Sequence, residues 1–278
     1  MVTSPEPDDA RVVPHLQAPS DTGEGGALPA APAPAATWSA QSARRAWSGV
    51  PGGDAAAQAG GFLDRLADAA VGDLAEAVGY LRGSVAAGSA YGAWIFDFDG
   101  TLADSEDMIV RATQAVLRGC GVVVDDAWVR AVPMSAPGEL RARALRELGV
   151  ALRWTDERLV REGFAFWLAH GDQLQPVRPV VALAKAARRK GLPLAVASAN
   201  HSRLVSAGLA ALGLEGVFTA VVGRDQVLVP KPDPEVFLRA AHLLKVAPQG
   251  CLAFENTDTG IAAAKAAGMD VVDVRTWP

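Results

Sequence analysis

Residues 93–105 read AWIFDFDGTLADS, a short apolar run that ends in two aspartates and a glycine. Asp97 and Asp99 are two positions apart, so on extended backbone both carboxylates point to one side while Phe98 points to the other. Two carboxylates so close repel each other unless a cation or a shared proton lies between them. Gly100 permits a sharp turn, and the amides of such a turn can face an anion. This stretch therefore predicts a strand that delivers acids to a charged ligand.

Short apolar runs and helical stretches alternate from residue 91 onward. The apolar runs cover residues 93–97, 193–198, 219–223, 251–255 and 270–275. The helical stretches between the later runs cover residues 180–191, 202–213, 234–245 and 260–268. Continuous apolar strands that alternate with helices are typical of a parallel sheet covered on both faces. We therefore predict an α/β fold with a Rossmann-like parallel sheet.

Three other regions differ from this pattern. Residues 107–170 carry only helix-like segments, so we interpret them as a helical domain inserted into a core of residues 91–106 and 171–278. Residues 1–60 are rich in Ala, Pro and Gly and predict a disordered arm. Residues 61–90 predict a helical extension, because apolar residues recur at helical spacing over residues 62–87. Either docking on the rest of the chain or self-association must cover this apolar face.

Composition excludes several functional classes. The chain has 278 residues, a formal net charge of −5 and 50% apolar residues, so nonspecific binding to nucleic acid is not favoured. No apolar stretch approaches the roughly 18 residues that span a bilayer. The two cysteines are far apart, which fits a reducing compartment, and the first residues lack the features of a secretory signal. We expect a cytoplasmic protein that binds neither nucleic acid nor membranes.

Polar residues follow the predicted strands. Ligands of open parallel sheets bind beyond the carboxyl ends of the strands, so these residues are candidates for a site. Besides the two aspartates they are Ser198, Asn200, Lys231, Glu255 and Asn256, and Ala199 adds its backbone amide. Carboxylates suit a hard cation, whereas a hydroxyl, an ammonium group and amides suit an anion. Together they predict a Mg²⁺-dependent phosphate site.

Four stretches, taken in order, resemble the four motifs of the haloacid dehalogenase superfamily of phosphotransferases over about residues 91–278. They are DFDGT (97–101), VASAN (196–200), KPDPEVF (231–237) and FENTDTGIAAAKAAGM (254–269). The inserted helices resemble the mobile cap of that family. The closing segment GIAAAKAAGMDVVDVR (260–275) is similar to the beta-phosphoglucomutase-like branch, which includes fructose-1-phosphate phosphatases.

This resemblance implies a Mg²⁺-dependent phosphatase acting on a small phosphorylated metabolite, with a sugar phosphate as the expected class. Asp97 would be the nucleophile that becomes an aspartyl-phosphate, and Asp99 would protonate the leaving oxygen and then activate water. The implied phosphate-binding residues are Thr101, Ser198, Ala199 through its amide, Asn200 and Lys231. The implied Mg²⁺ ligands are Asp97, Asp99 through its carbonyl, and Glu255 or Asn256.

Two positions depart from the family pattern. Asn256 replaces an acid that usually binds Mg²⁺, and an amide keeps the oxygen but loses the formal charge. Ile109 stands where the mutases carry a histidine, which favours hydrolysis over mutase chemistry. The alternatives to a phosphatase are a sugar-phosphate mutase and, because of Asn256, a binding protein with a degenerate site. Asp258 could either cap the following helix or support the metal.

Overall fold

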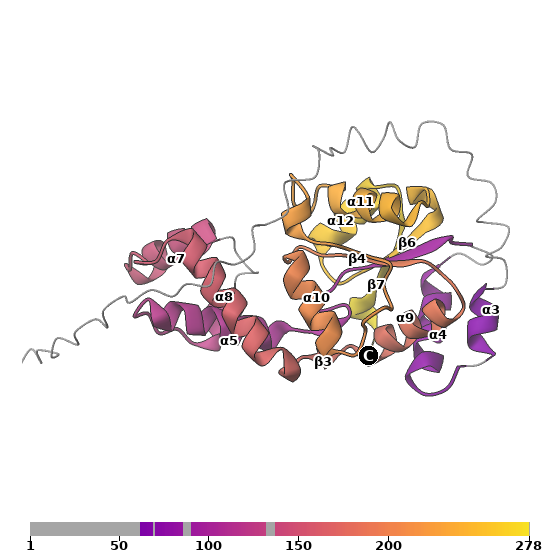
Figure 1. Ribbon diagram of the computed structural model, residues 1–278, viewed down its shortest axis with the longest axis horizontal. Helices are drawn as coiled ribbons and strands as arrows, with labels where there is room; N and C mark the ends of the chain where they lie inside the picture. The colour runs from indigo at the N-terminus through magenta and orange to yellow at the C-terminus, as the bar shows by residue number, and fades with distance from the viewer. Residues whose placement is uncertain (1–61, 69, 86–89, 132–136, 278) are drawn as a thin grey trace, which may run out of the picture. The chain divides into compact units, whose positions relative to one another are not determined.

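The computed structural model describes residues 62–68, 70–85, 90–131 and 137–277, and the predicted arm over residues 1–60 lies outside them. A sheet of five parallel strands forms the centre, in the order β5-β4-β1-β6-β7 (Figure 1). The strands are β1 (Ala93–Phe96), β4 (Leu194–Ala197), β5 (Ala220–Val222), β6 (Cys251–Glu255) and β7 (Asp270–Asp273). Each one coincides with a predicted apolar run, so the predicted parallel sheet is confirmed.

Helices cover both faces of the sheet, and they lie in two layers on opposite sides of it in Figure 1. They are α9 (Arg178–Arg189) and α10 (Ser202–Ala211) on one side, and α11 (Glu235–Leu244) and α12 (Asp258–Ala266) on the other. Successive strand residues point to opposite faces. Trp94 and Phe96 accordingly belong to the core beneath α9 and α10, whereas Ile95 belongs to the core beneath α11 and α12. This alternation explains why the strands are apolar at every position.

The apolar stretch at residues 62–87 forms two helices, α3 (Phe62–Ala67) and α4 (Asp73–Ser84), where a single helix was predicted. That prediction is wrong between the end of α3 at Ala67 and Gly72, which precedes α4 with a φ of 54°, a positive value that a helix residue does not adopt. Leu66, Val78 and Leu81 are buried in the same core as Trp94. The rest of the chain therefore covers this apolar face, which is the first of the two alternatives.

The chain forms a group of helices between β1 and β4. These are α5 (Glu106–Gly119), α6 (Asp126–Arg130), α7 (Pro137–Leu148) and α8 (Asp156–His170). They enclose a small apolar core of their own, to which Leu117, Ala144 and Leu159 contribute. The predicted inserted helical cap is present, while the domain boundaries drawn from the sequence stay a prediction.

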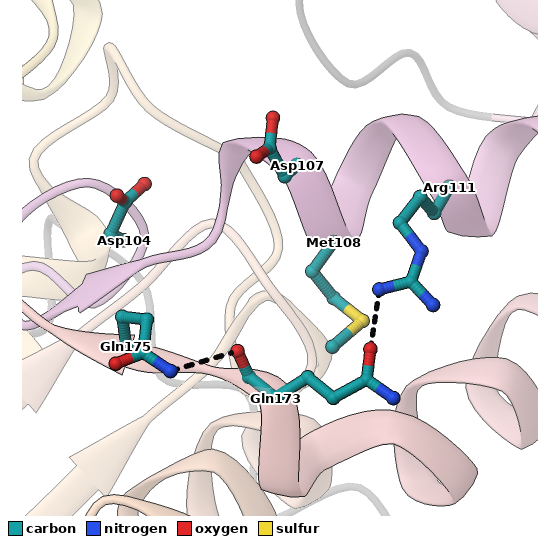
Figure 2. A pocket seen from close by; sticks show the side chains of 6 residues that line it. All are labelled: Asp104, Asp107, Met108, Arg111, Gln173 and Gln175. Carbon is teal, nitrogen blue, oxygen red and sulfur yellow. Dashed lines mark hydrogen bonds between the residues drawn. The ribbon is translucent and has the colours of Figure 1, made fainter.

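A short antiparallel ribbon joins the two crossings of the chain between sheet and cap. Its strands are β2 (Ala103–Asp104) and β3 (Gln175–Pro176). In Figure 2, Arg111 of α5 donates a hydrogen bond to Gln173 Oε1, and Gln175 Nε2 donates to the Gln173 carbonyl at 3.5 Å. The bond from Arg111 ties the start of the cap to its end. Two-residue strands leave no periodic pattern, so the sequence did not predict the ribbon.

Candidate active site

The carboxyl ends of three strands lie side by side. Phe96 at the end of β1 pairs with Val196 of β4 on one side and with Phe254 of β6 on the other. The Asp97 amide extends this register, because it donates to the Phe254 carbonyl at 2.9 Å. Parallel register therefore brings Asp97, Ser198 and Glu255, which are far apart in sequence, to one edge of the sheet.

Lys231 joins two carboxylates at this edge. Its Nζ donates to Asp97 Oδ1 at 2.7 Å and to Glu255 Oε1 at 2.5 Å. Burial raises the pKa of the Asp97 carboxyl to about 8, and the nearby Lys231 ammonium opposes this shift. Burial alone would lower the pKa of Lys231, but attraction to Asp97 and Glu255 outweighs it and the net shift is upward. The geometry thus fixes a charged ammonium group beside Asp97, since buried charges persist only when they are paired.

Glu255 is fully buried and surrounded by donors. While Oε1 accepts from Lys231, Oε2 accepts from the amides of Asn256 and Thr257 at 2.9 and 3.0 Å and from the Thr257 hydroxyl at 3.0 Å. Gly260 leaves room for this carboxylate, because a Cβ there would overlap it. Glu255 therefore holds Lys231 and the turn after β6, and its role as a metal ligand stays a prediction.

Asp99 is oriented by two polar neighbours. The Ser105 hydroxyl donates to Oδ1 at 2.7 Å, and Asn200 Nδ2 donates to Oδ2 at 3.4 Å. Burial raises the pKa of the Asp99 carboxyl, and the hydrogen bonds from Ser105 and Asn200 act in the opposite direction. Ser105 was missed in the sequence, because its contact depends on the turn at Gly100, whose φ is 75°. An acid with a raised pKa is suited to donating a proton.

Asn256 lies against the same turn. The Thr101 hydroxyl is 3.4 Å from Asn256 Oδ1, and a Cβ on Gly100 would overlap the Asn256 amide. The Asp97 carboxylate, the Asp99 carbonyl and the Asn256 amide are hard oxygen donors, which is the ligand class that Mg²⁺ prefers. Their chemistry fits this ion, although no three His, Cys, Asp or Glu side chains of the described residues form a metal-binding group.

The loop after β4 is held by its own side chains. Ser198 is buried, and its Oγ accepts from the Asn200 amide at 3.0 Å. Asn200 Oδ1 accepts from the His201 amide at 2.8 Å. Ala199, the second residue of the loop, is exposed. Within the described part of the chain the Ser198 hydroxyl donates to no acceptor, whereas the Asn200 amide group is already directed at Asp99.

Asp258 does not cap the following helix, and its support of a metal stays a prediction. Thr257 is the N-cap of α12, since its hydroxyl accepts from the Gly260 amide at 3.1 Å. Asp258 instead accepts from Arg275 at 2.9 Å on the surface. This ion pair links the start of α12 to the segment that follows β7.

Comparison with known proteins now places the chain in a family. Residues 94–274 match the haloacid dehalogenase-like hydrolases. The chain belongs to this family. Fructose-1-phosphate phosphatase YqaB of Escherichia coli is 38% identical over 186 residues, which cover 66% of this chain and 97% of the relative.

Two solved structures share the fold of this chain. One is a mutant of CbbY from Rhodobacter sphaeroides in complex with xylulose-(1,5)bisphosphate, with a TM-score of 0.59 and 25% sequence identity. The match covers 65% of this chain and 84% of CbbY. A beta-phosphoglucomutase from Clostridium difficile has the same fold, with a TM-score of 0.56 and 24% identity. This match covers 66% of this chain and 84% of the mutase. These findings confirm the predicted superfamily, the capped Rossmann-like fold and the enzyme class, a phosphoric monoester hydrolase.

Among the described residues no helix is long and apolar enough to cross a membrane.

Proposed function

We propose that this haloacid dehalogenase-like hydrolase is a Mg²⁺-dependent phosphatase of a small phosphorylated metabolite, in the first instance a sugar phosphate. The observation that carries the proposal is the buried Lys231 between Asp97 and Glu255, with Asp99 two positions further on. This arrangement combines a nucleophile, a cation and a second acid. A relative named fructose-1-phosphate phosphatase and a fold neighbour solved with a sugar bisphosphate support the substrate class.

In the first chemical step, an Asp97 carboxylate oxygen attacks phosphorus. Lys231 contacts Oδ1, and Oδ2 accepts no hydrogen bond from the part of the chain that the structure describes, so Oδ2 is the attacking atom we favour. The bond between phosphorus and the ester oxygen breaks as the Asp99 proton moves to that oxygen. The products of this step are a free alcohol and an aspartyl-phosphate on Asp97.

The second step returns the enzyme to its starting state. Asp99, now ionised, takes a proton from water while the water oxygen attacks phosphorus. The bond between Asp97 and phosphorus breaks, and inorganic phosphate leaves. Ser105 and Asn200 keep the Asp99 carboxyl in place through both steps, because each donates to one of its oxygens.

The residues around Asp97 would bind the phosphoryl oxygens. The Lys231 ammonium balances their charge, while the Ser198 hydroxyl and the Ala199 amide are the donors we assign to them. The Thr101 hydroxyl would first have to turn away from Asn256 Oδ1, to which it donates at 3.4 Å. Asn200 contributes through Asp99. Mg²⁺ would be held by the Asp97 carboxylate, the Asp99 carbonyl and the Asn256 amide oxygen. When bound, this ion supplies additional positive charge to the oxygens being transferred.

Asn256 is the observation that favours a second candidate, a binding protein with a weakened metal site. The neutral amide contributes less attraction for Mg²⁺ than a carboxylate would. The mutase alternative has less support, because Ile109 is an apolar lining residue of the space between cap and core. Hydrolysis therefore remains the proposed reaction.

A panel of phosphate esters with Mg²⁺, assayed for inorganic phosphate, tests the proposal. We expect the wild type to release phosphate, Asp97→Asn to lose this activity, and Asp104→Asn, which alters an exposed carboxylate on β2, to retain it. Activity that appears only in Asn256→Asp would instead establish the degenerate site. Conversion of glucose 1-phosphate to glucose 6-phosphate with little free phosphate would establish a mutase.

A further inference from the structure

Glu235, the first residue of helix α11, is a buried acid that the proposed reaction does not use. It is 2% exposed. Its Oε2 accepts hydrogen bonds from the backbone amides of Leu228 and Val229, each at 2.9 Å. Within the described part of the chain, Oε1 accepts none. The two amides and the amino end of α11, where the helix dipole favours an acid, therefore stabilise the charge of this carboxylate.

Both amides belong to the loop that carries Lys231 after β5. The side chains on this part of the loop are not held by burial, because Leu228 is 63% and Val229 is 49% exposed. Exposed apolar side chains gain little from packing. The hydrogen bonds to the Glu235 carboxylate are therefore the contacts that fix the loop on this side of Lys231.

The loop is closed on the other side of Lys231 as well. The Asp233 amide donates to the Pro230 carbonyl at 3.0 Å, and the Glu235 amide donates to Asp233 Oδ1 at 2.9 Å. Lys231 lies two positions after Val229 and four before Glu235. Glu235 thus binds the loop through its carboxylate on one side of Lys231 and through its backbone on the other.

The position of this loop matters because the Lys231 side chain is a flexible chain of four carbons. Its ammonium group donates to Asp97 and Glu255, and in the proposed reaction it must also face the phosphoryl oxygens. A misplacement of about 1 Å can cost about 100-fold in rate. A loop that moved would therefore weaken phosphate binding, although every residue in contact with the phosphate stayed the same.

We propose that Glu235 is a positioning residue, which holds the loop on both sides of Lys231 and so fixes the ammonium group where it meets the phosphoryl oxygens. Its effect on catalysis rests on the proposed phosphatase function, whereas its hold on the loop does not. An acid that only stabilised the first turn of α11 would leave the loop and Lys231 unchanged.

Two substitutions at this position differ in the hydrogen bonds that they keep. Glu235→Ala removes both side-chain bonds. In Glu235→Gln, the carbonyl oxygen can replace Oε2 and accept from both amides, while the NH₂ group replaces Oε1, to which no described residue donates. Asp73→Ala, which removes an exposed acid from the first position of α4, is the control for the helix end. Val78→Ala, at a buried position of α4, is the control for lost stability.

Hydrogen–deuterium exchange, resolved to single amides by NMR, tests the hold on the loop. In the wild type, the Leu228 and Val229 amides should exchange at least about 10-fold more slowly than in an unfolded peptide, because a bond to a charged acceptor contributes about that factor. They should lose this protection in Glu235→Ala and keep it in Glu235→Gln and both controls. Wild-type amides that exchange as in a peptide would overturn the proposal, even if Glu235→Ala did not fold.

Labelling with acetic anhydride, followed by mass spectrometry, reports on Lys231 itself. The exposed Lys265 of α12 is the internal reference. We expect the labelling of Lys231 relative to Lys265 to rise at least about 10-fold in Glu235→Ala, because local opening exposes the amine, and to stay near the wild-type ratio in Glu235→Gln and both controls. An unchanged ratio in Glu235→Ala would refute the role of Glu235 toward Lys231.

Kinetics connect the loop to the reaction. With an ester that the wild type hydrolyses, kcat/KM should fall by about 10-fold to 100-fold in Glu235→Ala and stay near the wild-type value in Glu235→Gln and Val78→Ala. An unchanged kcat/KM in Glu235→Ala would overturn the proposal. A wild type that hydrolyses no ester would refute the phosphatase proposal instead, and exchange and labelling would still decide whether Glu235 positions Lys231.

Discussion

Replacing Glu255 by glutamine should separate the role of this carboxylate from the rest of the site. The side chain keeps its shape but loses its charge, so Lys231 retains Asp97 as its partner and loses the other. Glutamine also has one oxygen where glutamate has two. Either Lys231 or the group of donors from Asn256 and Thr257 must then face an NH₂ group.

The expected loss follows from burial. The Glu255 and Lys231 side chains are 0% and 5% exposed, so the pair is shielded from water. Lys231 keeps its pair with Asp97, but one of the buried donors around position 255 then faces an NH₂ group, and a buried donor without an acceptor costs roughly 1–3 kcal/mol, or more when the donor is charged. A domain has about 5–15 kcal/mol of stability in total, so the variant should remain folded but be clearly destabilised.

Urea denaturation followed by tryptophan fluorescence measures the free energy of unfolding. Asp273→Asn is the matched control, because Asp273 pairs with Arg275 on the surface, where the two side chains are 35% and 46% exposed. Solvent-exposed pairs contribute only about 0–1 kcal/mol. If Glu255→Gln lost no more stability than the control, the argument that Glu255 holds Lys231 in place would be refuted.

Three further predictions concern other parts of the chain. Asn256→Asp should tighten Mg²⁺ binding by about tenfold, or about 1.4 kcal/mol. A titration with Mg²⁺ that follows the melting temperature without substrate would measure this change. An unchanged titration would contradict the role of Asn256 as a Mg²⁺ ligand. Gly260→Ala should destabilise the protein because its Cβ would overlap Glu255, whereas Gly79→Ala in α4, where a Cβ meets nothing, should stabilise it by roughly 0.8–1.0 kcal/mol in denaturation. Burial raises the pKa of Cys251 to about 12, so this thiol should resist alkylation at pH 8 until the protein is unfolded, as mass spectrometry of labelled peptides would reveal.

Most of the core and many of the site residues could be predicted from the chain itself. Strands buried on both faces must be apolar at every position, so β1 and β6 are visible as uninterrupted runs. Polar residues that interrupt such runs at their carboxyl ends meet at one edge of the sheet, which is why Asp97 and Ser198 could be named in advance. The helices between the strands were visible from their periodicity for the same reason of burial.

Other features depend on contacts that leave no local pattern. The break at Gly72 is a case where the apolar spacing continues although the backbone turns, so periodicity alone predicted one helix. The two-residue ribbon of β2 and β3 is too short to show any period. The contact of Ser105 with Asp99 exists because the turn at Gly100 folds the chain back on itself.

The sequence by itself determined the order of strands and helices, the inserted cap and the group of polar residues at the strand ends. These features follow from local burial, which the spacing of apolar residues along the chain indicates, and from the geometry of parallel sheets. Only the tertiary structure decided the role of Glu255, which holds Lys231 and so fixes it beside Asp97. Lys231 and Asp97 are 134 positions apart in the sequence. Side chains so far apart are brought together by tertiary packing, which no local pattern in the sequence predicts.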